Sequence, residues 1–230
     1  MKRIATAGRR PWLVELVGPA GAGKTTLAQS FFELDPWQHA CLTLWGLPRR
    51  FLAASAIALL PTVVAARRRG RPVHAREIAQ MMRVRALRYA IDRASKQGKT
   101  IILLDEGSVF GLTWLDVFFR PGADPALAQW RRREIVAWCR RLDAVVRLDA
   151  ANAILAHRIR TREQPHPVKN DPDPAIDAFT ARFRAAFDRV LTEMTAAGTV
   201  RLLRLQTGGG GRATDVLRLR AALQEALHAH

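Results

Sequence analysis

The run GPAGAGKT at residues 18–25 is the feature that most restricts how this chain can fold. Three glycines within six residues let the backbone adopt conformations closed to other residues, so that successive amide N–H groups can converge on one anion. An apolar segment, 12–17, precedes the run and a helical pattern follows it, which is the context that a G-x-x-x-x-G-K-[ST] motif requires. The sequence therefore predicts a phosphate-binding loop at the end of a β-strand.

The loop predicts a site for a nucleoside triphosphate with its Mg²⁺. The Lys24 ammonium would reach the β- and γ-phosphates as a point charge, and the Thr25 hydroxyl can be a ligand of Mg²⁺. A glycine-rich turn with an unrelated lysine is the alternative interpretation. The expected nucleotide-binding residues are Gly18, Gly21, Ala22, Gly23, Lys24, Thr25 and Thr26.

A second motif, KTIILLDEGSV, ends an uninterrupted apolar run with Asp105 and Glu106. Such a run is typical of a central parallel strand, whose carboxyl end would bring both acids beside the phosphate loop. Asp105 could hold the Mg²⁺, and Glu106 could orient or deprotonate an attacking hydroxyl. Alternatively, either acid caps a helix or lies on the surface, and the sequence does not decide which of the two would be the base.

The third motif is RLDAANAILAHRIRTREQPHPVK, in which Arg158 and Arg162 are four residues apart and share a helix face. We expect residues 152–172 to form a lid whose arginines close over a triphosphate, because guanidinium groups suit phosphoryl oxygens. His157, His166 and Lys169 could assist. A solvated helix is the alternative.

Short aliphatic runs alternate with longer helical patterns, which indicates βαβ units and a parallel sheet covered on both faces. We expect one α/β domain over residues 1–230. The predicted strands are 12–17, 39–44, 100–105, 144–149 and 200–206. The predicted helices are 24–33, 73–97, 126–141, 152–162, 175–197 and 213–229.

Residues 51–66 contain sixteen residues without a charge, and arginines flank them on both sides. A membrane-spanning helix needs about 20 apolar residues, and Pro61 interrupts this segment, so a transmembrane helix is disfavoured. A buried helix or a lid over the site fits better, within a candidate acceptor-side insertion at 46–72. A patch resting on an anionic membrane surface stays open.

The formal net charge of +17 predicts an anionic partner. Only five of the 37 basic residues are lysines, and so strong an arginine bias can also reflect a GC-rich genome. A nucleic-acid partner is compatible with this charge but is not favoured. Two cysteines without metal-ligand spacing, and no convincing signal peptide, predict a cytoplasmic protein.

The motifs GPAGAGKTT, IILLDEGSV and VVRLDAANAILAHRIRTR resemble those of the nucleoside and nucleotide kinases among P-loop proteins, the thymidylate kinase-like group in particular. The chain is also similar to kinase-like proteins of bacterial polysaccharide gene clusters. The resemblance implies a three-layer P-loop NTPase fold, with a five-stranded parallel sheet of order 2-3-1-4-5, helices on both faces and a lid after the fourth strand. It also implies ATP on the loop, with residues 207–212 against the adenine. The four glycines of this segment could equally form a flexible connection.

The chain departs from the thymidylate kinase pattern where an acceptor would bind. Glu106 stands where that group has an arginine, and the acceptor motif is only loosely matched by Gly46, Pro48, Arg49 and Arg50. Arg49 and Arg50 would suit an anionic acceptor. An aromatic cluster could line an acceptor pocket or fill the core, with Asp116, Arg120 and 131–133 as its polar contacts. Its members are Phe110, Trp114, Phe118, Phe119, Trp130 and Trp138.

These features together predict an ATP- and Mg²⁺-dependent phosphotransferase acting on a nucleoside, a nucleotide or a similar hydroxyl or phosphate compound. The predicted catalytic residues are Lys24, Asp105, Glu106, Arg158 and Arg162, with Thr25 and Asp105 as metal ligands. The alternative is a regulatory or assembly ATPase that acts on a protein, a membrane surface or a nucleic acid. A GTPase is disfavoured, because no guanine-specifying Asn-Lys-x-Asp is present.

Overall fold

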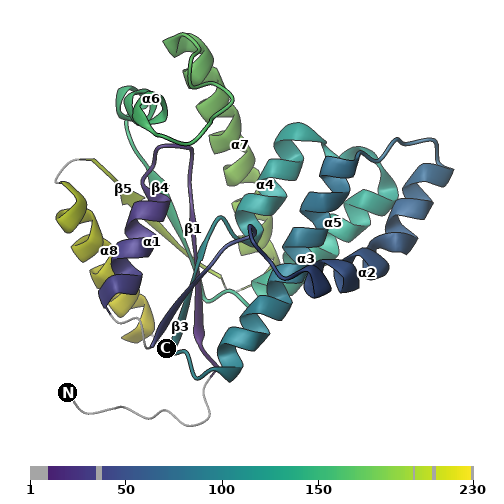
Figure 1. The fold of residues 1–230 in the computed structure, drawn as a ribbon, viewed down its shortest axis with the longest axis horizontal. Coiled ribbons are helices and arrows are strands. Elements are labelled where there is room, and N and C mark those ends of the chain that lie inside the picture. Colours follow the sequence, from purple (N-terminus) through teal and green to yellow (C-terminus); the bar gives the residue numbers. More distant parts are fainter. Residues whose placement is uncertain (1–9, 35–37, 199, 209–210, 229–230) are drawn as a thin grey trace.

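The computed structural model, which describes residues 10–34, 38–198, 200–208 and 211–228, has a central five-stranded sheet (Figure 1). All neighbouring strands are parallel, and their order is β2-β3-β1-β4-β5, as predicted. The strands are β1 (Trp12–Val17), β2 (His39–Leu42), β3 (Ile101–Asp105), β4 (Ala144–Asp149) and β5 (Arg201–Gln206).

The strands β1, β3 and β4 form the centre of the sheet, and most of their side chains are apolar and buried, as in a parallel sheet that is covered on both faces. The edge strand β2 ends at Leu42, two residues before the predicted end, because the chain turns away towards Gly46 in a left-handed conformation (φ 71°). The strands β3 and β5 each begin one residue later than predicted.

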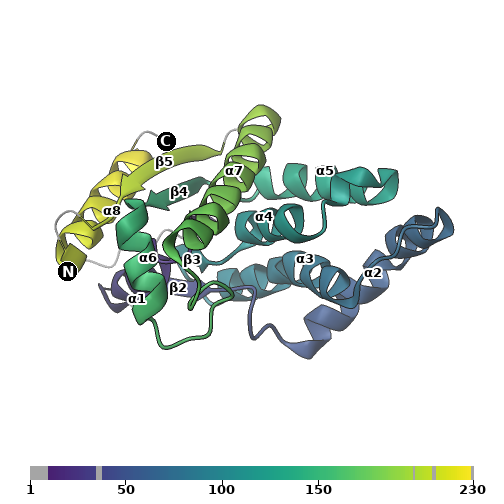
Figure 2. The same ribbon diagram turned by 90° about the horizontal axis from the view of Figure 1, so that it is seen from above.

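Helices cover both faces of the sheet, which gives the predicted three layers (Figure 2). One face packs against α1 (Lys24–Leu34) and α8 (Gly211–His228). The lid helix α6 (Asn152–Thr161) lies beyond the end of β4. The other face carries α3 (Ala75–Lys96), α4 (Ser108–Phe118), α5 (Pro125–Cys139) and α7 (Asp173–Ala197).

Helix α4 is absent from the predicted elements, because its aromatic residues indicate a pocket or a core cluster without a clear helical pattern. It begins directly after the carboxyl end of β3 and packs against α3 and α7. This position brings its aromatic side chains to the same edge of the sheet as the phosphate loop.

The apolar segment 51–66 belongs to a long helix, α2 (Arg49–Arg68), which packs against α3 and α5. Only one row of its side chains is buried: Ser55, Leu59, Val63 and Ala66. The expectation of a buried helix is therefore wrong for the opposite row, which is exposed. Among the described residues, α2 is the one helix that is long and apolar enough to cross a membrane, judged by length and composition alone.

Candidate active site

The phosphate loop lies between β1 and α1, and its glycines have the backbone conformations that the motif requires. Gly18, Gly21 and Gly23 have φ angles of 151°, 83° and 88°, which side chains of L-residues rarely allow. A Cβ atom on Gly18 would lie 2.2 Å from the carbonyl oxygen of Leu148, so the loop also passes very close to β4. The loop is thereby fixed at the carboxyl edge of the sheet.

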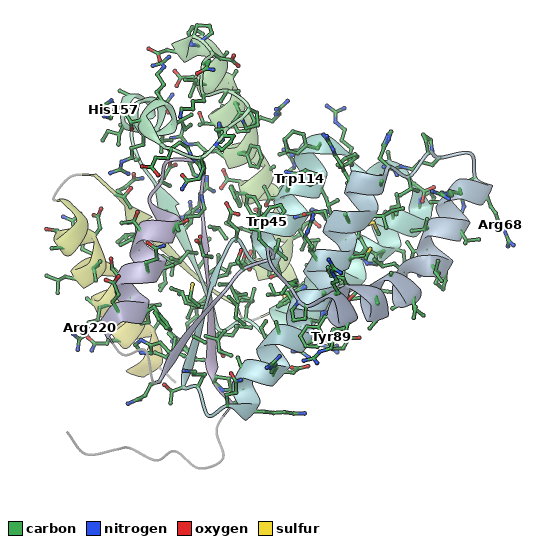
Figure 3. The ribbon with its side chains drawn as sticks, in the orientation of Figure 1. Trp45, Arg68, Tyr89, Trp114, His157 and Arg220 are labelled. Atoms are coloured by element: carbon green, nitrogen blue, oxygen red, sulfur yellow. The ribbon has the colours of Figure 1, made fainter. Side chains whose placement is uncertain are left out.

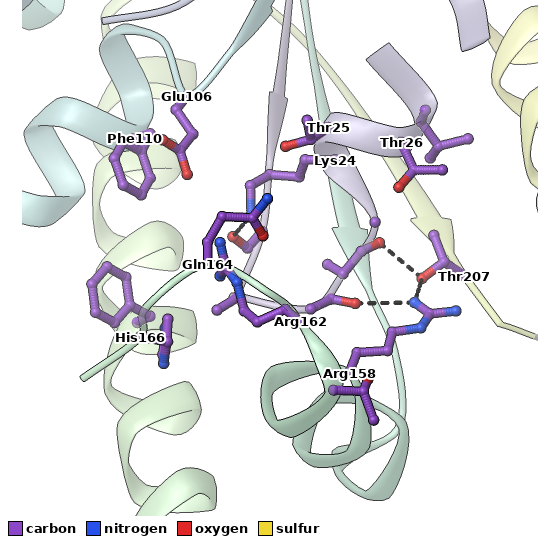
Figure 4. A pocket seen from close by; sticks show the side chains of 18 of the residues that line it. Lys24, Thr25, Thr26, Glu106, Phe110, Arg158, Arg162, Gln164, His166 and Thr207 are labelled. Atoms are coloured by element: carbon purple, nitrogen blue, oxygen red, sulfur yellow. Dashed lines mark hydrogen bonds between the residues drawn. The ribbon is translucent and has the colours of Figure 1, made fainter. Parts of the chain in front are cut away.

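Lys24, at the start of α1, is 8% exposed and lies under the loop (Figure 4). Its Nζ donates hydrogen bonds to the carbonyl oxygens of Gly18 (2.9 Å) and Pro19 (3.0 Å). Burial lowers the pKa of Lys24, although the nearby carboxylates of Glu106 and Asp105 oppose this effect. An anion on the loop would give this buried ammonium a direct charge partner.

Glu106 follows β3 in a left-handed conformation (φ 57°) and lines the same cavity as Lys24. Its backbone carbonyl accepts a hydrogen bond from the Leu44 amide (3.1 Å), and its carboxylate accepts one from the indole N–H of Trp45. These contacts join the segments that follow β2 and β3. They hold the Glu106 carboxylate at the side of the cavity away from the lid helix (Figure 4).

Arg158 and Arg162 both line the cavity, but they contact different parts of it. The Arg158 guanidinium donates to the carbonyl oxygen of Gly21 (3.0 Å) and to the Thr207 hydroxyl (3.4 Å), so it joins the lid to the loop. Arg162 was predicted to be the last residue of the lid helix, but α6 ends at Thr161 and Arg162 follows it in an extended conformation. Its charge lowers the pKa of both Lys24 and His166, which places it on the phosphate side.

The other predicted lid residues divide between the cavity and the lid itself. His166 lines the cavity, and burial lowers its pKa more than the neighbouring cations do. Lys169 donates to the carbonyl oxygen of Arg162 and so supports the lid. His157 lies on the outer side of α6, and it is not among the described residues that line the cavity (Figure 3).

The cavity has a volume of about 700 Å³ and continues from the phosphate loop to a wall of aromatic side chains. Phe110, Trp114 and Phe118 of the predicted cluster belong to this wall. The other three members do not line it: Trp130 and Trp138 are buried in the core, and Phe119 packs against it.

Three wall residues were missed by the sequence analysis: Trp45, Phe179 and Phe183. Trp45 comes directly after the predicted second strand, 39–44, and this position was a usable signal. Phe179 and Phe183 are four residues apart on one face of α7, but only the tertiary structure places that face beside α4.

The polar residues expected around the acceptor are elsewhere. Asp116 accepts two hydrogen bonds from Arg131 (2.9 and 2.7 Å), and both line a separate cavity with Arg120 and Arg132. Arg49 and Arg50 begin α2 and, with 46–48, are not among the described residues that line the main cavity. The expectation that 51–66 forms a lid is likewise wrong, because none of these described residues lines the cavity.

The fold is similar to that of a solved shikimate kinase from Bacteroides thetaiotaomicron. The TM-score is 0.51 and the sequence identity 15%, with 93% of this chain and 98% of that chain covered. The chain has a P-loop kinase fold. No protein-family model matches the sequence, and no curated protein matches it.

In this P-loop kinase fold, Asp105 and Thr25 were the predicted Mg²⁺ ligands, and their surroundings fit this role. One carboxylate oxygen of Asp105, Oδ1, is buried and has no hydrogen-bond partner among the described residues. Burial raises the pKa of Asp105, whereas a hydrogen bond with the Thr25 side chain and the charge of Lys24 lower it. Among the described residues, no group of three or more His, Cys, Asp or Glu side chains could hold a metal.

The predicted adenine loop, 207–212, also reaches the cavity. The Thr207 hydroxyl donates to the carbonyl oxygen of Ala22 (3.0 Å), and Gly208 lines the cavity beside Arg158. Gly209 and Gly210 lie outside the described residues. The contacts of Thr207 connect the end of β5 directly to the phosphate loop.

A buried acid that the sequence analysis missed holds the aromatic wall in position. Glu15, in the middle of β1, is 0% exposed and accepts hydrogen bonds at the start of α4. Its donors are the amides of Val109 and Phe110 (both 3.0 Å) and the Ser108 hydroxyl (2.8 Å). Burial raises the pKa of Glu15 to about 7, although these hydrogen bonds lower it. A charged residue inside an apolar strand was the available signal.

We expect Glu15 to make the stability of the fold depend on pH. Folded Glu15 keeps its proton up to about pH 7, whereas the unfolded side chain loses it near 4.5. The contribution of Glu15 to the free energy of unfolding is therefore complete below pH 4.5 and is lost as the pH rises through about 7. Relative to Glu15→Gln, which has no titratable group at this position, the wild type should lose about 3 kcal/mol of free energy of unfolding across this range. Urea denaturation at pH 4.5 to 8 measures it, and a constant difference would contradict the prediction.

Proposed function

We propose that this chain is an ATP- and Mg²⁺-dependent phosphotransferase that moves the γ-phosphoryl group to a small-molecule acceptor. The observation that carries this proposal is one continuous cavity, which joins Lys24 and the phosphate loop to the carboxylate of Glu106 and an aromatic wall. A kinase needs this combination of a donor site and an acceptor site with a proton acceptor between them. The similarity of the fold to a solved shikimate kinase supports phosphoryl transfer as the type of reaction.

The donor side would hold the triphosphate through backbone amides of residues 21–26 and the ammonium of Lys24. Thr25 and Asp105 would hold Mg²⁺, which when bound neutralises charge on the phosphates. Arg158 already bonds to Gly21 and Thr207, so its role in this proposal is to keep the phosphate loop and the adenine-side loop together. Arg162, beside Lys24, is the arginine that would balance charge on the transferred group.

In the transfer, an acceptor oxygen attacks the γ-phosphorus and forms a new P–O bond. The bond from the γ-phosphorus to the bridging oxygen breaks, and ADP leaves with the electron pair. Glu106 accepts the hydroxyl proton, because its carboxylate faces the cavity and is fixed by Trp45. Lys24 and Arg162 remain beside the negative charge throughout.

The acceptor side favours a molecule with a flat or apolar face and a hydroxyl group. The cations that line the described cavity, Lys24, Arg158 and Arg162, are all in the phosphate loop and lid, whereas the opposite wall is aromatic. Aromatic side chains stack on rings and on apolar sugar faces. We therefore favour a nucleoside or another neutral hydroxyl compound over a nucleotide as the acceptor.

Release of ADP in the presence of candidate acceptors tests the proposal. A panel of nucleosides, nucleotides and sugars should contain a class that raises the rate of ADP release at least about tenfold. Mass spectrometry should then show one phosphorylated acceptor for each ADP. Release of ADP with an equal amount of free phosphate under every condition would contradict a kinase and favour the regulatory or assembly ATPase.

A further inference from the structure

The outer face of α2 exposes a row of large apolar side chains. Ile57, Leu60 and Val64 are 69%, 57% and 42% exposed, and their spacing of three and four residues places them on one side of the helix. The opposite row, which includes Leu59 and Val63, is buried against α3 and α5. The helix is therefore fixed to the domain by one face and presents an apolar stripe to solvent with the other.

Arginines stand at both ends of this apolar stripe. Arg49 and Arg50 begin the helix, and residues 67–69 are three consecutive arginines at its end, which forms the outer tip of the molecule near Arg68 (Figure 3). The segment 36–76 contains seven arginines and no aspartate or glutamate. This surface, residues 49–69, thus combines exposed aliphatic side chains with a local excess of positive charge.

Two other partners match this surface less well than an anionic bilayer does. A second copy that packed its α2 against this one would bring arginine clusters together in either direction, because both ends of the helix are basic. A nucleic acid would pair with the arginines but would leave the aliphatic stripe in water. A bilayer accepts aliphatic side chains between its acyl chains, while flanking arginines extend to the lipid phosphates.

We propose that α2 is a membrane-docking helix that lies in the interface of a bilayer rich in anionic lipids. Burial of the Leu59 and Val63 row keeps the helix attached to α3 and α5, so it lies on the membrane and does not cross it. Among the described residues that line the cavity, none belongs to α2, so docking leaves the lining of the cavity unchanged. The proposal is independent of the phosphotransferase activity.

Co-sedimentation of the full chain with vesicles tests this proposal. The protein should bind vesicles of phosphatidylcholine with phosphatidylglycerol at least about tenfold more strongly than phosphatidylcholine alone, and high salt should weaken binding. The triple variant Ile57→Gln, Leu60→Gln, Val64→Gln should lose at least about tenfold in binding. Its matched control is Leu217→Gln on α8, which removes an apolar side chain that is 64% exposed.

The contribution of the arginines to vesicle binding is tested in parallel. Replacing Arg67 and Arg68 with glutamine should weaken binding to anionic vesicles, whereas replacing the exposed Arg218 and Arg220 of α8 should have little effect. Circular dichroism and a thermal midpoint that match those of the wild type would show that each variant is folded. Equal loss in the α8 controls, no preference for anionic vesicles, or a dimer in solution that the triple variant dissociates would each overturn the proposal.

Discussion

Replacing Lys24 with alanine is expected to reduce kcat/KM for ATP-dependent phosphoryl transfer by at least about 10³-fold, equivalent to about 4 kcal/mol. Lys24 is the buried cation that lies directly under the phosphate loop, and its Nζ needs only to leave the carbonyl oxygens of Gly18 and Pro19 to reach a bound phosphate. Both binding and transfer should suffer, because the ammonium contacts the donor before and during the reaction. Steady-state kinetics and calorimetric titration with ATP measure the two effects.

The control for this experiment is Lys96→Ala, which removes an exposed lysine near the end of α3. It should leave both measurements unchanged. Because Lys24 also bonds to the loop, the thermal midpoint of each variant should be compared with that of the wild type. Unchanged ATP affinity and turnover in a folded Lys24→Ala protein would contradict the assigned site.

Replacing Glu106 with glutamine is expected to reduce kcat by about 10² to 10⁴-fold, while the KM for ATP changes by no more than about twofold. Glutamine keeps an oxygen that can accept the hydrogen bond from Trp45, so the geometry of the wall is preserved. It cannot accept the proton of an acceptor hydroxyl. The loss should therefore appear in the chemical step, and pre-steady-state measurement of phosphorylated acceptor would locate it there.

The matched control is Glu163→Gln, which neutralises an exposed acid of the lid. Its kcat should remain close to that of the wild type. If Glu106→Gln lost affinity for the acceptor with an unchanged kcat, Glu106 would position the acceptor and another group would take the proton. Equal losses in both variants would point to a general effect of charge in the cavity.

Local sequence was sufficient to predict the phosphate loop, because its glycines and Lys24 act through backbone freedom and charge within one segment. The strands followed from apolar runs, and the resemblance to P-loop kinases supplied their order. The position of Asp105 and Glu106 followed because parallel strands end at one edge of the sheet. The functional roles of these residues stay predictions.

The aromatic wall depended on contacts between distant segments, and these were not readable from the chain. Phe179 and Phe183 reach the cavity only because α7 packs against α4, and Glu15 caps α4 from a strand more than ninety residues earlier. The charge-free run 51–66 was equally ambiguous. Whether its outer face is covered depends on how many helices pack around α2, and a single sequence does not specify this.

The most direct measurement is a crystal structure with a non-hydrolysable ATP analogue and Mg²⁺. We predict that the β- and γ-phosphates accept hydrogen bonds from the amides of residues 21–26, and that Lys24 Nζ has moved from the Gly18 and Pro19 carbonyls to a phosphate oxygen. Mg²⁺ should lie beside Thr25 and Oδ1 of Asp105. A structure with the analogue bound elsewhere, and Lys24 still bonded to those carbonyls, would contradict the central claim.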